Sequence, residues 1–322
     1  MLENVTLVLI SHNSEKTIER TLRSIEPNLN SGMKLIIIDD DSTDKTFHMS
    51  RAWAKGRASI IVEKIHRNGS AGARNYGLSK VATEFVMFCD SDDEVLFEDI
   101  NALDSSVLPE HDVIVHDYVF VDALSHSTQR RLEMAHGKNE ISTKSEFIQS
   151  LLMKEMGFWR YVYRTEFLKR NNIRFVGELS ELRADYFVLD DYFFLLKVLS
   201  TASSIYYAPS AIYKYYANSN ASIEKFKVQS RFMARAALIQ LGEIGKLERH
   251  INKKWLGNRL NEQLCSSFAT ISLKHGARHY WEFSKSISEV DRNLLNKPLL
   301  SVSKSQVELV ILFARKCLRF LR

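Results

Sequence analysis

Two apolar runs in this sequence each end in a cluster of carboxylates. Residues 36–38 are isoleucines followed directly by aspartates at 39, 40 and 41, and the apolar residues 85–89 are followed by aspartates at 90, 92 and 93. A short apolar run bounded by turn-forming residues is typical of a strand covered on both faces. Ligands of open α/β sheets bind beyond the carboxyl ends of such strands. Because clustered carboxylates repel one another unless a cation or donor groups compensate them, the sequence predicts a site for a divalent metal and a phosphorylated ligand.

The composition is that of a globular protein and argues against nucleic acid as a partner. Hydrophobic residues make up 45% of the 322 residues and charged residues 26%, which suits one large domain or two modest ones. The net charge of +5 is mild, and the basic residues form no stripe interleaved with aromatics, as they do in nucleic-acid-binding proteins. No run approaches the roughly 20 apolar residues of a membrane-spanning helix, so we expect any membrane contact to be peripheral.

The cysteines and the N-terminal residues predict a cytoplasmic location. Cys89, Cys265 and Cys317 lie far apart, which favours neither a disulfide framework nor a zinc site. The first four residues lead into a strand-like segment without a basic and apolar leader. A reducing compartment fits both observations.

Strands and helices alternate through the first 120 residues. The expected strands are residues 5–10, 34–38, 59–63, 84–89 and 113–120, and the expected helices are 15–25, 44–54 and a helix that follows a loop at 69–72 and ends at 78. We expect Pro27 to stop the first helix. This alternation predicts an α/β fold with a mostly parallel sheet built from right-handed βαβ units and flanking helices.

The pattern changes in the rest of the chain. Helices are expected at 144–154 and 190–199, and two short aromatic strands around 204–216. Beyond residue 223 the strand signals cease, and residues 226–245, 247–273 and 306–322 have helical periodicity. We therefore predict an α/β domain over residues 1–224 and an all-helical C-terminal domain over residues 225–322.

Four short motifs follow the predicted strands in order. They are Ser11-His12-Asn13, the acidic segment 39–44, the glycine-containing segment 68–75, and Asp90-Ser91-Asp92-Asp93. Together with residues 159–175 and Asp190-Asp191, their order and spacing resemble the family-2 glycosyltransferases, in particular those of bacterial capsule and lipopolysaccharide synthesis. The resemblance covers residues 4–223. It implies the GT-A fold, a nucleotide-sugar donor, a divalent metal and inversion at the anomeric carbon.

The resemblance assigns ten residues to the nucleotide-sugar donor: Ser11, His12, Asn13, Asp39, Asp40, Gly69, Arg74, Asn75, Asp90 and Ser91. An ionised Asp39 could accept a hydrogen bond from a base N–H, and the matching acid of the family reads uracil. His12 stands where the family usually has tyrosine, and Asp41 where it usually has glycine. The acids after Asp39 also suit a strand-to-helix turn, and Gly69 could serve only a tight loop.

Asp90 and Asp92 form a DxD element, and the resemblance assigns these two acids, with Asp93 as a further candidate, to the metal, Mn²⁺ or Mg²⁺. Acids on one loop can hold such an ion while it bridges the two phosphates of the donor. A solvated acidic turn is the alternative for an isolated motif, and the position after a buried strand favours the metal. The sequence leaves open which acid contacts the metal and which contacts the ribose.

Asp191 is the candidate general base, because inverting transfer needs a carboxylate to accept the proton of the acceptor hydroxyl. In the family this base is the second acid of a Glu-Asp pair that opens a helix, and Asp190 replaces the glutamate here. Two acids at a helix N-terminus are also favourable with the helix dipole alone, and Asp185 is a nearby competitor. Trp159 and Arg160, with Asp190, are candidates for the sugar or acceptor pocket, although a tryptophan also suits simple packing.

The leading hypothesis is a metal-dependent inverting transferase that moves one sugar, from a UDP-sugar or another nucleotide-diphosphate sugar, to a glycan or lipid-linked glycan of the bacterial surface. Single addition is favoured because the QxxRW motif of processive members is absent. A basic amphipathic helix over 304–322 could contact the inner face of the cytoplasmic membrane or pack within the protein, and oligomers are possible. The alternatives are a non-catalytic nucleotide-sugar-binding scaffold and a sugar nucleotidyltransferase, which would need a glycine- and arginine-bearing loop after the first strand.

Overall fold

The computed structural model describes residues 2–66, 68–96, 110–122, 127–131, 157–175 and 190–217. The chain divides into two compact units, Met1–Lys225 and Phe226–Arg322. The helices predicted at 144–154 and beyond residue 225, including the basic amphipathic helix, lie outside the described residues and stay predictions. None of the helices in the described segments is long and apolar enough to cross a membrane.

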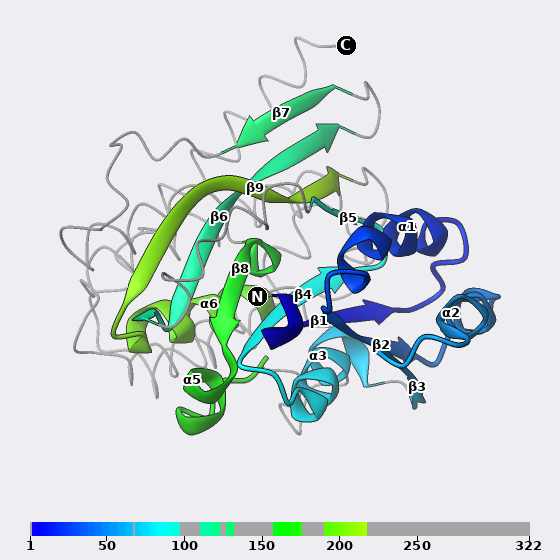
Figure 1. The fold of residues 1–322 in the computed structure, drawn as a ribbon, viewed down its shortest axis with the longest axis horizontal. Coiled ribbons are helices and arrows are strands. Elements are labelled where there is room, and N and C mark those ends of the chain that lie inside the picture. Colours follow the sequence, from blue (N-terminus) through cyan, green and yellow to red (C-terminus); the bar gives the residue numbers. More distant parts are fainter. Residues whose placement is uncertain are drawn as a thin grey trace, which may run out of the picture. The chain divides into compact units, whose positions relative to one another are not determined.

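One sheet organises the described part of the chain (Figure 1). Its nine strands are β1 (Val5–Ser11), β2 (Lys34–Asp40), β3 (Ile60–Ile65), β4 (Phe85–Asp90), β5 (Glu94–Val95), β6 (Val113–Asp122), β7 (Thr128–Arg131), β8 (Tyr161–Arg164) and β9 (Ile205–Ala217). Their order is β3-β2-β1-β4-β8-β6-β9-β5, with β7 paired to β6. The neighbours from β3 to β4 are parallel, as predicted, and the half beyond β4 is mixed, with β8 antiparallel to both β4 and β6.

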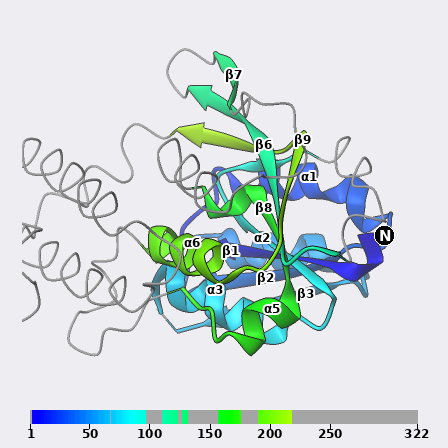
Figure 2. The same ribbon diagram turned by 90° about the vertical axis from the view of Figure 1, so that its left-hand side faces the viewer.

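The helices are α1 (Ile18–Leu29), α2 (Thr46–Ala54), α3 (Gly69–Lys80), α5 (Thr165–Arg170) and α6 (Asp190–Thr201), with short 3-10 turns η1 (Leu2–Asn4) and η4 (Phe158–Arg160). Helix α3 packs so closely on the sheet that a Cβ at Gly77 would lie 2.4 Å from Val8 of β1. Val8 pairs with Phe88 of β4, and Phe88 contacts Phe194 of α6, so α3 and α6 cover the same face. The side view in Figure 2 shows β1 between α3 and α1.

An aromatic cluster fills the core beneath α6. Phe88 forms edge-to-face contacts with Phe158, Tyr163, Phe175 and Phe194, at centroid distances of 5.1 to 6.1 Å. All five rings are buried. Because burial of such a side chain contributes about 1.5–3 kcal/mol, this cluster ties β4, β8 and α6 into one unit.

The register of the parallel strands brings the predicted motifs together. Ser11 at the end of β1 pairs with Asp39 of β2, and Ile10 pairs with Asp90 of β4. Three of the four predicted motifs therefore meet at one edge of the sheet, because parallel strands in register end side by side.

Two predictions about the helices were wrong. Helix α1 continues through Pro27 to Leu29. Pro27 and Arg23, whose carbonyl loses its partner, are both exposed, so water can satisfy that carbonyl at little cost. Residues 69–72 were expected to form a loop, and they form the first turn of α3.

The strand predictions also need correction in the second half. Residues 205–217 form one continuous strand, where two short strands were expected. The pairing of β9 with β6 shifts register around Pro209, which cannot donate to the ladder, so a bulge replaces the expected break. The short strands β5, β7 and β8 were not predicted.

Candidate active site

The turn after β2 is built around Asp39. Its Oδ1 accepts a hydrogen bond of 2.9 Å from the Ser42 amide, and its Oδ2 lies 3.5 Å from the Ser11 hydroxyl. Asp41 occupies the left-handed region with φ of 61°, which an aspartate tolerates. Lys64 holds this turn by donating to the Ser42 carbonyl at 2.7 Å. Asp39 thus lies at the predicted edge but is fully buried, with one oxygen committed to the turn.

His12 is fixed next to this turn. Its Nδ1 lies 2.6 Å from the Asp40 carbonyl, which can only accept, so Nδ1 carries the proton. Nε2 then accepts from the Asn13 amide at 3.1 Å, and the Asn13 side-chain oxygen accepts from the Thr43 amide at 2.9 Å. His12 and Asn13 are exposed, so the strand end presents an oriented aromatic ring.

Asp40 connects the sheet to the start of α3. Its Oδ1 accepts from the Asn68 amide at 2.7 Å, immediately before the helix. Gly69 has φ of 70°, and a Cβ at Gly72 would lie 2.6 Å from the Cβ of Asn68. Both glycines are therefore required by the backbone at this helix N-terminus, which supports the structural alternative for them.

Arg74 reaches from α3 to the acid that ends β4. Its Nη2 donates to Asp90 Oδ1 at 2.8 Å, and its guanidinium carbon lies 4.3 Å from the ring centre of Phe158. The Arg74 side chain is 8% exposed and that of Asp90 26% exposed, so this pair is stronger than a surface ion pair. Asn75 bonds the backbone of Phe175 at both its amide nitrogen and its oxygen, at 2.7 and 2.9 Å. Arg74 thus orients Asp90, and Asn75 holds the 175 segment.

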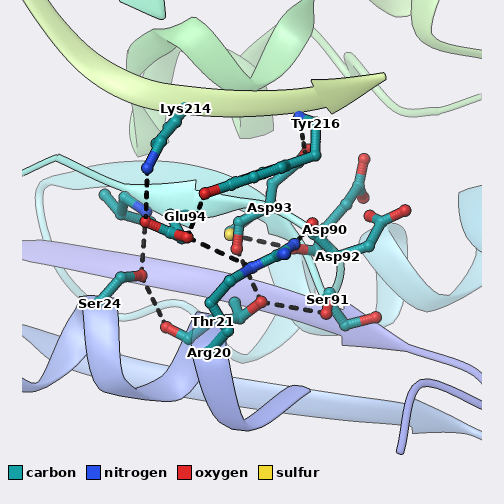
Figure 3. A network of polar contacts seen from close by, with 12 residues as sticks. Arg20, Thr21, Ser24, Asp90, Ser91, Asp92, Asp93, Glu94, Lys214 and Tyr216 are labelled. Atoms are coloured by element: carbon teal, nitrogen blue, oxygen red, sulfur yellow. Dashed lines mark hydrogen bonds and ion pairs between the residues drawn. The ribbon is translucent and has the colours of Figure 1, made fainter. Parts of the chain in front are cut away.

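The loop between β4 and β5 is held from below by α1 (Figure 3). The Thr21 hydroxyl contacts the carbonyls of Ser91 and Asp93 at 3.0 and 2.7 Å. Arg20 donates to the Asp92 carbonyl and pairs with Glu94. Ser91 itself contacts the β1 motif, because its hydroxyl lies 2.6 Å from that of Ser14. The backbone of this acidic loop is therefore fixed before any ligand binds.

Strand β9 holds the same loop through Asp93. Asp93 Oδ2 accepts from the Tyr213 hydroxyl and Oδ1 from the Tyr216 amide, both at 2.8 Å. Burial raises the pKa of Asp93 well above its usual value, and the neighbouring Asp92 and Asp90 add to the rise. Asp93 is 1% exposed, so of the three predicted metal acids it is the one that the structure turns inward. Figure 3 shows Asp90 and Asp92 directed away from this cluster.

Glycosyl transferase family 2 matches residues 6–168 of the sequence, which include all the strand-end motifs described above. The chain belongs to this family. Its relatives include the putative glycosyltransferase EpsH of Bacillus subtilis, 23% identical over 257 residues, which cover 76% of this chain and 71% of the relative. The teichoic acid poly(glycerol phosphate) polymerase of Staphylococcus epidermidis is 24% identical over 236 residues, 70% of this chain but only 31% of the polymerase.

The fold of this family-2 chain matches a solved structure. Staphylococcus aureus TarS, residues 1–349 in complex with UDP-GlcNAc, superposes with a TM-score of 0.69 at 20% sequence identity, over 97% of this chain and 87% of that one. The similarity confirms the predicted GT-A fold. TarS is named a poly(ribitol-phosphate) β-N-acetylglucosaminyltransferase, and the sequences are 25% identical over 206 residues, 63% of this chain and 35% of TarS.

Asp190 and Asp191 open α6, as the sequence predicted. The structure describes the backbone of these two residues and not their side chains. Acids in the first turn of a helix lie in the favourable field of its N-terminus. The competitor Asp185 lies outside the described residues.

Trp159 packs in the interior of this family-2 domain. Its ring stacks on Tyr213 at 4.4 Å and 15° and on Tyr215 at 5.3 Å and 10°, and it contacts Tyr118 edge-on. This supports the packing alternative for Trp159. Arg160, the other pocket candidate, is fully buried at the start of β8.

Three of the residues that hold the acidic loop were not identified from the sequence. Tyr213 was predicted only as part of an aromatic strand around 204–216, and Arg20 and Thr21 lie on a helix that carries none of the four motifs. Tyr213 is separated from Asp93 by 120 positions. The only available signal was the alternation of tyrosines along β9, which marks the faces of a strand but not what those faces contact.

Proposed function

We propose that this family-2 protein transfers one sugar, with inversion, from a UDP-sugar to an acceptor of the bacterial cell-surface glycans. The observation that carries the proposal is the register of β2, β1 and β4, which places Asp39, Ser11 and Asp90 at one edge of the sheet. The relatives named as teichoic acid polymerase and as a glycosyltransferase of poly(ribitol-phosphate) support a cell-surface acceptor. The solved complex of TarS with UDP-GlcNAc supports a UDP-sugar donor.

The donor would lie along this edge from β2 to β4. The exposed ring of His12, oriented by the Asp40 carbonyl, offers a surface on which a base can stack. Asp39 Oδ2, whose sole contact within the described residues is 3.5 Å long, keeps acceptor capacity for a base N–H. The diphosphate then falls beside Asp90, where Arg74 supplies positive charge.

Asp90 and Asp92 would hold Mg²⁺ or Mn²⁺. Their carboxylate oxygens are the ligand type that both ions prefer, and both side chains are half-exposed. Within the described residues no group of three His, Cys, Asp or Glu side chains could hold a metal by itself. Two carboxylates with the remaining positions open suit an ion that also binds substrate phosphates. When bound, the ion would neutralise charge on the departing diphosphate.

Asp191 is the residue to which we assign the proton transfer. In a single displacement, the acceptor oxygen forms its bond to the anomeric carbon while the bond to the diphosphate oxygen breaks with its electron pair. The acceptor hydroxyl proton goes to the Asp191 carboxylate. Its position at the N-terminus of α6 stabilises the ionised base before this transfer.

The test is a panel of UDP-, GDP-, CMP- and dTDP-sugars, assayed for nucleotide release with Mn²⁺ and with EDTA. We expect metal-dependent release of UDP from one donor. Asp191→Asn should retain donor binding and lose about 10²- to 10⁴-fold in turnover, the usual contribution of a general base. Asp185→Asn is the matched control and should retain turnover. A protein that binds none of the donors under any metal condition would contradict the proposal and favour a scaffold.

A further inference from the structure

The guanidinium of Arg160 is the least satisfied polar group in the described part of the chain. The residue is 0% exposed, yet its Nε, Nη1 and Nη2 atoms have no hydrogen-bond partner among the described residues. Arginine stays charged in proteins and buried charges are otherwise paired, so this arrangement is strongly unfavourable by itself. It persists in a fold whose neighbouring arginines, Arg74 and Arg164, are each paired with a carboxylate.

Two further buried polar atoms without partners lie around Arg160. They are the hydroxyl of Tyr161 and Nε2 of His116. The Arg160 guanidinium carbon lies 5.4 Å from the ring centre of Tyr161. Val115 pairs with Tyr161 across the sheet, so the next residue, His116, stands beside Arg160. Three unsatisfied side chains therefore converge where β6 meets the start of β8.

These groups are predominantly donors. Burial lowers the pKa of His116 to about 3, so the ring is neutral. Its Nδ1 lies 3.1 Å from the Ser210 hydroxyl, which can donate to it and leave the proton on Nε2. The guanidinium offers several N–H groups and no acceptor, and the tyrosine offers one O–H. A positively charged set of groups that offers more donors than acceptors matches an oxyanion.

The position of Arg160 relative to the proposed donor site follows from the strand order. Along the sheet, β2 and β1 carry the nucleotide end, β4 carries Asp90, and β8 comes next. Because β8 is antiparallel to β4, Arg160 before the start of β8 lies at the same edge as the end of β4. Trp159 stacks on Tyr213, whose hydroxyl accepts from the Asp90 amide, so Arg160 lies one strand beyond the acidic loop.

We propose that Arg160, with Tyr161 and His116, forms a subsite for a carboxylate or phosphate group carried by a substrate. The planar fork of the guanidinium binds two oxygens of such a group at once. The group belongs either to an acidic donor sugar or to an anionic acceptor. This inference rests on the proposed function for the identity of the substrates, but the binding itself can be tested without turnover.

The first test measures Tm of the full chain with glycerol 3-phosphate or glucuronate as probes. At about five times the dissociation constant, we expect either probe to raise Tm of the wild type by about 2 to 4 °C. Arg160→Met should abolish this shift, and Arg160→Lys should reduce it. Arg164→Gln, which removes the nearby arginine at the end of β8 that is already paired with Glu84, should leave it unchanged.

The same variants distinguish a ligand-binding role of Arg160 from a purely structural role. Without a probe, Arg160→Met should be as stable as the wild type or more stable, because it removes an unpaired buried charge. A Tm several degrees below that of the wild type, with no response of the wild type to either probe, would show that Arg160 serves the fold and would overturn the inference.

Turnover assays then identify the source of the oxyanion. If the donor carries it, Arg160→Met should lower kcat/KM for UDP-glucuronate at least 10-fold relative to UDP-glucose. If the acceptor carries it, glycerol 3-phosphate should inhibit transfer in the wild type and not in Arg160→Met, for the same donor. Donor turnover without any probe effect would refute the subsite alone, whereas a probe effect without turnover of any donor would refute the proposed function alone.

Discussion

The hydroxyl of Tyr213 connects β9 to the acidic loop, and Tyr213→Phe removes that one oxygen. The hydroxyl donates to Asp93 Oδ2 at 2.8 Å and accepts from the Asp90 amide at 3.2 Å. Tyr213 is fully buried, and burial raises its pKa well above the usual value, so the group remains a neutral donor. Phenylalanine keeps the ring that stacks on Trp159.

The expected loss of stability in Tyr213→Phe follows from these two hydrogen bonds. Each of these hydrogen bonds contributes about 1 kcal/mol, and more where the acceptor is charged, and the Asp90 N–H would be left without its partner. Allowing for partial relaxation, we expect Tyr213→Phe to lower the free energy of unfolding by about 2–3 kcal/mol. At about 2–4 °C per kcal/mol, Tm should fall by about 4 to 12 °C.

The assay is urea unfolding followed by circular dichroism, with Tyr206→Phe as the matched control. Tyr206 lies on the same strand and stacks on His111 at 5.2 Å, but within the described residues its hydroxyl forms no hydrogen bond. The control should change stability by less than about 0.5 kcal/mol. We also expect Tyr213→Phe to raise the Mn²⁺ concentration needed for half-maximal turnover, because Asp90 loses its fixed backbone. Equal stability of the two variants would refute the proposal that Tyr213 holds the loop.

Three further predictions concern groups outside the acidic loop. His116→Asn should make the stability of the protein less sensitive to acid. The pKa of His116 is about 3 in the folded state and 6.5 in the unfolded state, so the wild type loses stability as pH falls below 6.5, by about 2 kcal/mol at pH 5. Urea unfolding at pH 7.5 and 5.0 should show a smaller loss in the variant. Asn75→Ala should cost about 2 kcal/mol, because both backbone groups of Phe175 lose a partner, and Asn75→Asp, which keeps only the acceptor, should lie between in thermal melts. Gly77→Ala should cost about 1–3 kcal/mol, since its Cβ would lie 2.4 Å from Val8, and unaltered unfolding would contradict the close packing.

The sequence was sufficient to predict the parallel half of the sheet, because each of its strands is a continuous apolar run followed by a helical period. β1, β2 and β4 lie within one or two residues of the predicted ranges. Once those strands are parallel and in register, the motifs behind them must meet at one edge. The meeting of these motifs at one edge, where the candidate site lies, therefore follows from the predicted strands.

The mixed half of the sheet could not be predicted in the same way, because the order of its strands depends on pairings between distant segments. β8 inserts between β4 and β6 although it follows both in the chain, and β9 continues through Pro209 because a bulge absorbs the missing donor. Likewise α1 extends past Pro27, where both Pro27 and Arg23 are exposed to water. In each case the course of the backbone depends on which residues are buried and which segments pair, and a single sequence does not give this information.

The different environments of Asp92 and Asp93 show how contacts between distant segments affect the candidate site. Asp92 and Asp93 are chemically identical neighbours, and both suit a metal on sequence grounds. In the turn between β4 and β5 the Asp93 side chain points inward, where Tyr213 and Tyr216 of β9 donate to it, while the Asp92 side chain is directed away from this cluster. The motif supplies the acids, but a strand more than a hundred residues later decides which of them can meet a substrate. Asp93→Asn should therefore impair the loop, because the amide nitrogen of asparagine cannot accept from Tyr213 or Tyr216 as a carboxylate oxygen does, and Asp92→Asn should impair metal-dependent turnover.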